Sequence, residues 1–225
     1  MRWKISVITQ SQNSLDKSDL LSKKLETGLE ALGISLSASA RSSLLEYCGL
    51  LTKWNKTFNL TSVDDPEQMI SLHLLDSLAV LPFLPGGRVL DVGTGAGLPG
   101  IPLAIARPDQ AFVLLDSNGK KTRFLVQASG QLGLKNVSVV NQRADKYQAH
   151  EQFDVIISRA FSSLGQFLLA CDRLLSPGGQ FLAMKGKFPE DELRHLPDGF
   201  YLDSSAELKI PGLDAERHLL MLRRS

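Results

Sequence analysis

Three glycines alternate with other residues near the middle of the chain, at Gly93, Gly95 and Gly97. An apolar run over residues 89–92 comes directly before them and carries the acid Asp91. Glycine lets the backbone turn sharply and approach a ligand, and a helix that starts there points its amide groups at that ligand. The pattern predicts a cofactor loop between a buried strand and a helix.

A second acid, Asp116, ends the next apolar run, where the ribose diol of a nucleotide would lie. Dinucleotide-binding loops read GxGxxG and bind a pyrophosphate, which a nearby carboxylate would repel. Here the spelling is Asp-x-Gly-x-Gly-x-Gly, with Asp91 two residues before Gly93. A carboxylate suits the ammonium and sulfonium charges of S-adenosylmethionine, and the spelling resembles the first motif of methyltransferases that use it. Methyl transfer is therefore favoured, and a nicotinamide-dependent oxidoreductase is the alternative.

The elements that must position these residues alternate in type after Pro85. Short, nearly continuous apolar runs predict strands of a parallel sheet, and helical spacing between them predicts covering helices. The expected strands are 89–92, 112–115, 137–140, 155–157 and 181–184, with a closing pair at 201–208 and 218–222. The expected helices are 99–106, 120–132 and 164–175. This is a doubly wound α/β domain.

Before residue 85 the pattern is helical throughout. Leucines recur at helical spacing over residues 16–32, where Gly33 ends the helix, and Ser37 is a suitable cap for a second one. Asp65 followed by Pro66 predicts the start of a third helix that runs to about residue 81. We expect residues 1–84 to form a helical cap on a cofactor-binding domain of residues 85–225, as one integrated globular unit.

Composition limits the class of protein. The 225 residues carry a formal net charge of +1, so any nucleic-acid partner must be held by a local basic patch. No apolar stretch approaches the roughly 20 residues of a membrane span, and no His, Cys and Asp cluster predicts a metal site. Cys48 and Cys171 lie far apart, which favours a reducing compartment. We expect a cytoplasmic protein without a membrane partner.

Polar motifs recur along the chain beyond the glycine loop. They are Lys53-Trp-Asn-Lys-x-x-Asn59-Leu-Thr61, His73-x-x-Asp76-Ser77, Asp91-Val-Gly-Thr-Gly-Ala-Gly-Leu-Pro-Gly100, Asp116-Ser117-x-Gly-Lys120-x-x-Arg123-Phe124, Ser158-Arg159-Ala160-Phe161, Lys185-Gly186 and Glu216-Arg217-His218. Together they resemble the glucose-inhibited division protein B family, which methylates guanine N7 in small-subunit (16S) ribosomal RNA. The resemblance covers about residues 44–222. It implies a Rossmann-like class I methyltransferase fold, with a seven-stranded, mostly parallel sheet, helices on both faces and an N-terminal helical cap.

The same resemblance implies a set of cofactor-binding residues. S-adenosylmethionine would be contacted by Gly93, Leu98, Ala144, Asp145 and Arg159, and the spacing argument adds Gly95 and Asp116. All of these follow predicted parallel strands, at the sheet edge where open α/β sheets bind ligands. Two alternatives stay open, because Asp145 suits a turn around Lys146 and Arg159 suits a surface ion pair.

The substrate residues follow from the resemblance and from the chemistry of guanine. Its N7 carries a free lone pair, so alignment and exclusion of water suffice for methyl transfer. The candidates for alignment are Arg159, Lys185 and His73, and those for RNA binding are Asn59, Arg123 and Lys185. His73 and Asp76 suit a packed hydrogen-bonded pair equally well. The expected partner is 16S ribosomal RNA or the small ribosomal particle, bound by a monomer, and a non-catalytic RNA-binding or assembly protein is the second alternative.

Overall fold

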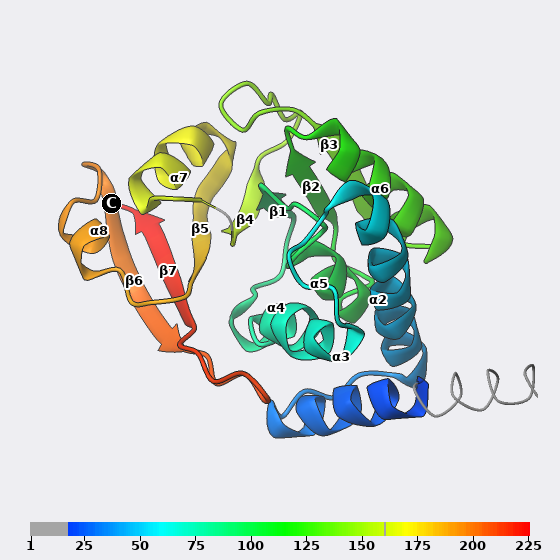
Figure 1. Ribbon diagram of the computed structural model, residues 1–225. Coiled ribbons are helices and arrows are strands. Elements are labelled where there is room, and N and C mark those ends of the chain that lie inside the picture. Colours follow the sequence, from blue (N-terminus) through cyan, green and yellow to red (C-terminus); the bar gives the residue numbers. More distant parts are fainter. Residues whose placement is uncertain (1–17, 160) are drawn as a thin grey trace, which may run out of the picture.

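The computed structural model describes residues 18–159 and 161–225, and its centre is a sheet of seven strands (Figure 1). The strands are β1 (Val89–Val92), β2 (Phe112–Asp116), β3 (Val137–Asn141), β4 (Phe153–Ser158), β5 (Leu175–Lys185), β6 (Phe200–Glu207) and β7 (His218–Arg224). Their order is β3-β2-β1-β4-β5-β7-β6, and β7 alone runs antiparallel to its neighbours. The predicted seven-stranded, mostly parallel sheet is confirmed.

Alternate residues of the central strands pack into two hydrophobic clusters, one on each face of the sheet. Val89 and Leu114 lie in the cluster that the N-terminal helices share, whereas Leu90 and Val113 lie in the other. The first face is covered by α2 (Ala38–Phe58), α5 (Gly100–Ala106) and α6 (Gly119–Gln131), and the second by α7 (Leu164–Cys171). Burial on both faces explains why these strands read as continuous apolar runs.

The second and third helices before the sheet begin where the capping signals predict, whereas the predicted start of the first, at residue 16, lies outside the described residues. Residues 18–31 are helical, α2 follows, and a third segment consists of α3 (Pro66–Met69), η1 (Ile70–Leu75) and α4 (Asp76–Leu78). The Ser37 side chain accepts a hydrogen bond from the Ala40 amide, and Asp65 accepts one from the Glu67 amide. Buried leucines of these helices belong to the same hydrophobic cluster as β1 and β2.

Two predicted helices are wrong in extent. The third helix does not run unbroken to residue 81, because η1 is a π-helical turn, α4 ends at Leu78 and a 3-10 turn, η2 (Leu81–Phe83), follows. The helix predicted over 164–175 ends at Cys171, and η3 (Asp172–Leu174) leads directly into a strand β5 of 11 residues. Apolar spacing alone does not separate a short buried helix from a buried strand. A further short helix, α8 (Glu190–Arg194), was not predicted.

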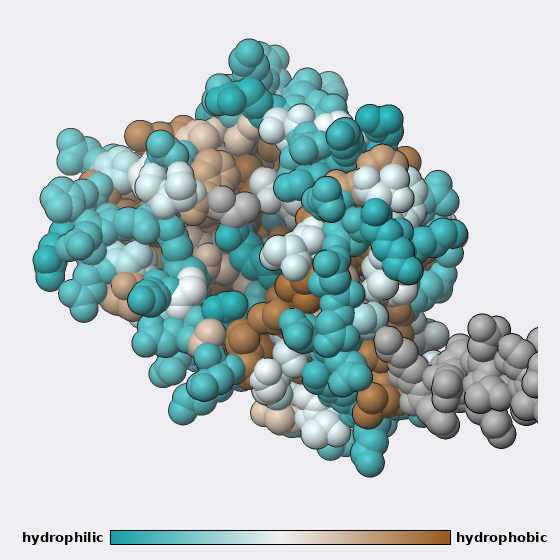
Figure 2. Space-filling model, viewed as in Figure 1, coloured by the Kyte–Doolittle hydropathy of each residue, from teal (hydrophilic) through white to brown (hydrophobic). Residues whose placement is uncertain are grey.

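The surface is mostly hydrophilic in the view of Figure 2, and hydrophobic side chains gather over α7. On that helix, Leu169 is 65% exposed. Within residues 18–159 and 161–225, no helix combines the length and the apolar character needed to cross a membrane.

Candidate active site

The glycine loop joins β1 to α5 and depends on glycine at each alternate position. Gly93, Gly95 and Gly97 have φ angles of +66°, +62° and +95°, a region that other residues rarely adopt. At Gly97 a β-carbon would also lie 2.6 Å from the Ile101 side chain. The Tyr47 hydroxyl of α2 donates a hydrogen bond of 2.7 Å to the Ala96 carbonyl, so the N-terminal helices hold the loop as well.

Asp91 is fully buried beneath this loop and ties its two ends together. One carboxylate oxygen, Oδ2, accepts hydrogen bonds from the Thr94 hydroxyl at 2.6 Å and the Gly100 amide at 2.8 Å. Its other oxygen has no hydrogen-bond partner, and burial raises the pKa of Asp91 to about 6. Asp91 does not line the cofactor cleft described below, and its contacts in this structure close the loop from beneath.

Replacing Asp91 with Asn is expected to remove a pH dependence of stability. In the wild type the folded-state pKa of about 6 lies above the ordinary 3.8, so the folded state binds more protons between these values. The free energy of unfolding therefore falls by about 3 kcal/mol as pH rises through that window. Asn keeps an acceptor for Thr94 and Gly100 without a charge. The stability of the variant relative to wild type should rise from pH 4 to pH 7 in urea unfolding, and a constant difference would contradict this assignment.

Asp116 ends β2 and contacts the loop from the neighbouring strand. Its Oδ2 accepts a hydrogen bond of 2.8 Å from the Gly95 amide, and its Oδ1 accepts one of 2.8 Å from the Asn118 amide. The side chain is mostly buried, yet it lines an open cleft. It is therefore held rigidly at the position where the sequence predicts a ribose contact.

A cleft of about 660 Å³ lies at the carboxyl ends of β1, β2 and β3 and is bounded on its far side by α7. Four of the predicted cofactor residues line it: Gly93, Asp116, Ala144 and Asp145. The other walls combine apolar groups with polar ones from Phe161, Gln166, Leu169 and Lys121. This volume is within the roughly 300–1,000 Å³ of small-molecule sites, and an acid beside an apolar wall fits a ribose and an adenine.

The remaining predicted cofactor residues do not line this cleft. Leu98 is buried under the loop at 4% exposure, and Gly95 contributes its amide to Asp116. Asp145, which does line the cleft, also forms an exposed ion pair of 3.0 Å with Arg143, which lowers the pKa of Asp145. Arg159 lies in a separate pocket, so the structure divides the predicted cofactor residues between a cleft, its supporting loop and a second site.

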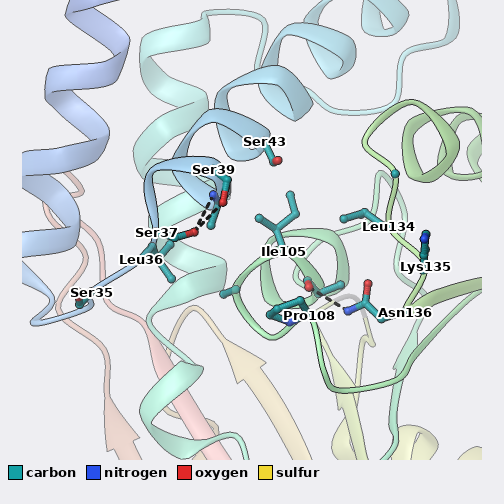
Figure 3. A pocket seen from close by; sticks show the side chains of 14 residues that line it. Ser35, Leu36, Ser37, Ser39, Ser43, Ile105, Pro108, Leu134, Lys135 and Asn136 are labelled. Carbon is teal, nitrogen blue, oxygen red and sulfur yellow. Dashed lines mark hydrogen bonds between the residues drawn. The ribbon is translucent and has the colours of Figure 1, made fainter.

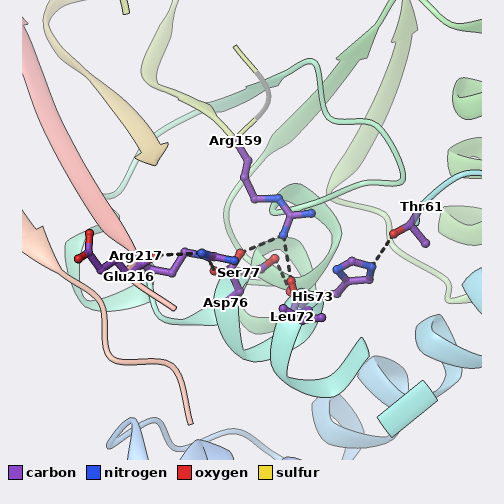
Figure 4. Close-up of polar contacts among 8 residues, drawn as sticks. All are labelled: Thr61, Leu72, His73, Asp76, Ser77, Arg159, Glu216 and Arg217. Carbon is purple, nitrogen blue, oxygen red and sulfur yellow. Dashed lines mark hydrogen bonds and ion pairs between the residues drawn. The ribbon is translucent and has the colours of Figure 1, made fainter. Parts of the chain in front are cut away.

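That second site is a polar pocket of about 330 Å³ beside the ends of β4 and β5. It brings together His73, Asp76, Arg159 and Lys185, which the sequence places far apart, and adds Arg217. Figure 4 shows all of these except Lys185. Asp76 is 1% exposed, and its two oxygens pair with Arg159 Nη1 and Arg217 Nε, each at 2.9 Å. One buried carboxylate thus holds two arginines, one directly after β4 and one directly before β7.

His73 lies in the π-helical turn η1, next to Asp76 in the pocket but not bonded to it. Its Nε2 lies 2.9 Å from the Thr61 hydroxyl, and its Nδ1 is buried without a hydrogen-bond partner. The alternative of a hydrogen-bonded His73–Asp76 pair is therefore wrong. Burial lowers the pKa of His73, so the imidazole is neutral at pH 7.

Lys185 closes the pocket at the end of β5. Its ammonium contacts both oxygens of Glu192, at 2.9 and 3.0 Å, and Glu192 also accepts a hydrogen bond from the Leu164 amide. The lysine is thereby fixed between α7 and α8, with 14% of its side chain exposed.

The other two predicted RNA-binding residues lie outside both the cleft and the pocket. Asn59 is exposed and caps α2 in a left-handed conformation with φ of +50°. Arg123 is exposed on α6, where its Nε donates a hydrogen bond to the Gly119 carbonyl. Neither contacts the polar pocket.

A further hollow of about 540 Å³ lies at the opposite, amino-terminal edge of the sheet (Figure 3). Small hydroxyl side chains at the start of α2 line it, including Ser37, which already caps that helix. Asn136 donates there to the carbonyls of Ala104, Arg107 and Gln110. The residues that line this hollow include none from the glycine loop, so the hollow is not the cofactor site.

Arg217 and Glu192 are the main groups of this region that sequence reasoning missed. Arg217 stands in the motif Glu216-Arg217-His218, which offered a signal, but its partner Asp76 is 141 positions away. Glu192 belongs to an acidic run that gives no indication of a contact with Lys185. Among the described residues no group of three or more His, Cys, Asp and Glu side chains is arranged to hold a metal.

Comparison with known proteins identifies the family. Residues 40–220 match the family model GidB, rRNA small subunit methyltransferase G. The ribosomal RNA small subunit methyltransferase G of Nitrosococcus oceani is 53% identical over 199 residues, which cover 88% of this chain and 93% of that protein. The protein of that name from Serratia proteamaculans is 52% identical, with 90% of this chain and 99% of its own length covered.

Solved structures support the fold. TrmN from Thermus thermophilus matches with a TM-score of 0.54 and 22% identity, over 66% of this chain and 48% of its own. A ribosomal protein L11 methylase from Lactobacillus delbrueckii subsp. bulgaricus matches with a TM-score of 0.51 and 17% identity, over 67% and 77%. The predicted Rossmann-like methyltransferase fold is confirmed, and the chain belongs to the GidB family, rRNA small subunit methyltransferase G.

Proposed function

We propose that this protein transfers the methyl group of S-adenosylmethionine to N7 of a guanine in small-subunit (16S) ribosomal RNA. The observation that carries the proposal is the pairing of a glycine-loop cleft with a polar, cationic pocket at the same edge of the sheet. Ser158 links the two strand ends beside these sites: its hydroxyl at the end of β4 donates a hydrogen bond to the Val92 carbonyl at the end of β1. Membership of the GidB family supports the substrate class.

The cofactor residues fall into three groups by what they would do. Gly93, Asp116, Ala144 and Asp145 line the cleft and would contact S-adenosylmethionine, whereas Gly95 and Leu98 shape the loop. Arg159 lies close enough to Asp91 to lower its pKa electrostatically, so we place it between cofactor and substrate. When bound, the cofactor supplies an electrophilic methyl group.

The chain's own contribution to the chemistry would be alignment and exclusion of water. Guanine N7 attacks with a free lone pair, so no residue has to remove a proton first, and holding N7 in line with the methyl group lowers the barrier. Burial raises the pKa values of the Cys48 and Cys171 thiols to about 12, which argues against a cysteine nucleophile and a covalent enzyme intermediate. His73, Arg159 and Lys185 would align the base.

The partner and the setting complete the proposal. Asn59, Arg123 and Lys185 would hold the RNA, as part of 16S ribosomal RNA or the small particle, in a cytoplasmic monomer. Residues 1–84 would serve as a helical cap and residues 85–225 as the cofactor-binding domain, in one integrated unit. The hydrophobic cluster that β1 shares with α2 supports this last point.

The direct test is incubation with methyl-labelled S-adenosylmethionine and 16S RNA, either free or in small particles, followed by digestion to nucleosides. We expect label in 7-methylguanosine only, at one position that sequencing can map. Label in another nucleoside would overturn the N7 assignment. Binding of NADH in place of S-adenosylmethionine would support an oxidoreductase, and RNA binding without turnover would support a non-catalytic assembly protein.

Replacing Arg123 with Ala is expected to weaken RNA binding without changing cofactor affinity. The exposed guanidinium would contact one phosphate. Without that contact, the slope of log K against log salt concentration should become shallower by roughly 0.7, the value for one phosphate contact on a single strand. Filter binding at several salt concentrations measures this. The matched control is Lys135→Ala, which removes an exposed cation at the opposite sheet edge. If both variants had the same slope, Arg123 would not be an RNA-contacting residue.

A further inference from the structure

Arg217 is held beside the polar pocket with part of its guanidinium unused. Its Nε donates to Asp76 Oδ1 at 2.9 Å, and its Nη1 donates to the Glu216 carbonyl at 2.8 Å. Its Nη2 forms no hydrogen bond with any described residue, while 25% of the side chain is exposed and the residue lines the pocket. A guanidinium group holds its five N–H donors in one rigid plane. Hydrogen bonds at Nε and Nη1 therefore also fix the direction in which Nη2 can donate.

Asp76 is the fixed point of this arrangement. It is 1% exposed on α4, and its second oxygen holds Arg159, whose Nη1 also donates to the Leu72 carbonyl at 3.2 Å. If this buried carboxylate were removed, both arginines would lose the ion pair that fixes the plane of the guanidinium group. Asp76 therefore fixes the orientation of both guanidinium groups, and both of its oxygens are occupied by them (Figure 4).

The free donors determine what the pocket binds. Three cations, from Arg159, Arg217 and Lys185, face two carboxylates, Asp76 and Glu192, and the neutral His73 adds no charge. The pocket therefore offers hydrogen-bond donors and a small positive charge, which suits a ligand edge made of acceptors. Guanine presents two acceptors, O6 and N7, on one edge, whereas adenine has an amino donor in place of O6.

We infer that Arg217 is a specificity-determining residue that donates from Nη2 to O6 of the target guanine, and that Asp76 is its positioning residue. The inference rests on the proposed function. A donor on O6 fixes the base in its plane, leaves the N7 lone pair free for the methyl group and rejects adenine. The two carboxylates limit the electrostatic cost of moving positive charge onto the base in this cationic pocket.

The test is a double-mutant cycle between Arg217 and the O6 atom. The substrates are 16S RNA with guanine, with 2-aminopurine, which lacks O6, or with inosine, which keeps it, at the mapped position. For the wild type, 2-aminopurine, which keeps the 2-amino group of guanine but lacks O6, should lower kcat/KM about 10- to 100-fold relative to guanine. Inosine keeps O6 but lacks the 2-amino group, so it measures the effect of that group separately. Arg217→Gln should lower kcat/KM on guanine by a similar factor, and on that variant 2-aminopurine should cost less than about threefold relative to guanine. Cofactor affinity, measured by calorimetry, should stay the same.

Arg223→Gln is the matched control, because Arg223 lies on β7, the strand that Arg217 directly precedes, and pairs through its Nε with a carboxylate, Asp203, at 3.2 Å, but away from the pocket. It should keep both the wild-type rate and the 2-aminopurine penalty. If Arg217→Gln does not fold, Arg217→Lys completes the same cycle. Additive effects of Arg217 and O6, or equal wild-type rates on guanine and 2-aminopurine, would overturn this inference. Absence of 7-methylguanosine from the wild-type reaction would instead overturn the proposed function.

Discussion

Replacing Asp76 with Ala is expected to lower the free energy of unfolding by about 3 kcal/mol and the rate of RNA methylation at least about 100-fold. The carboxylate is 1% exposed and pairs with two arginines, so its loss leaves both without their partner. The arginine side chains are 29% and 25% exposed, so water relieves part of the cost, and the lower end of the range for broken buried pairs applies. The melting temperature should fall by about 10 °C.

The control for this prediction is Asp203→Ala, which removes the carboxylate of the half-exposed pair with Arg223. A surface pair of this kind contributes no more than about 1 kcal/mol, and the variant should keep its methylation rate. Thermal unfolding and single-turnover methylation measure the two effects separately. Equal destabilisation by both substitutions, or wild-type methylation by the Asp76 variant, would show that Asp76 does not organise the pocket.

Replacing Asp116 with Ala is expected to weaken S-adenosylmethionine binding about 100-fold or more. Hydrogen bonds to a charged group contribute about 1.5–3 kcal/mol each, and a carboxylate at this position would accept from the ribose hydroxyls. The substitution also removes the acceptor of the Gly95 amide, at 2.8 Å, so the glycine loop loses an anchor. Isothermal titration calorimetry with the cofactor alone measures the change without RNA.

Two further variants separate the causes of that loss. Asp109→Ala removes an exposed acid at the other end of the sheet and should bind the cofactor as the wild type does. Asp116→Asn keeps an acceptor for the Gly95 amide and should lose less affinity than the Ala variant. If the affinity of the Ala variant for the cofactor stayed within threefold of wild type, Asp116 would not be the ribose contact.

The folding pattern and the cofactor loop were predictable because both are local properties of the sequence. Alternation of apolar runs and helices gave the sheet, and the capping signals at Ser37 and Asp65 placed two helix starts correctly. The glycine spacing is equally local, because the positive φ angles at Gly93 and Gly95 exclude most other residues. The π-helical turn over η1 was missed, since its residues have the same apolar spacing as an ordinary helix.

The roles of single charged residues depended on contacts that no local pattern contains. Asp91 and Asp116 look alike in the sequence, each at or near the end of an apolar strand, yet one is fully buried beneath the loop and the other lines the cleft. The sequence by itself determined the fold, the loop and the class of cofactor. Only the tertiary structure decided that Asp76 holds Arg159 and Arg217 together, because that ion-pair network joins a helix to the segments next to two strands that are distant in the chain.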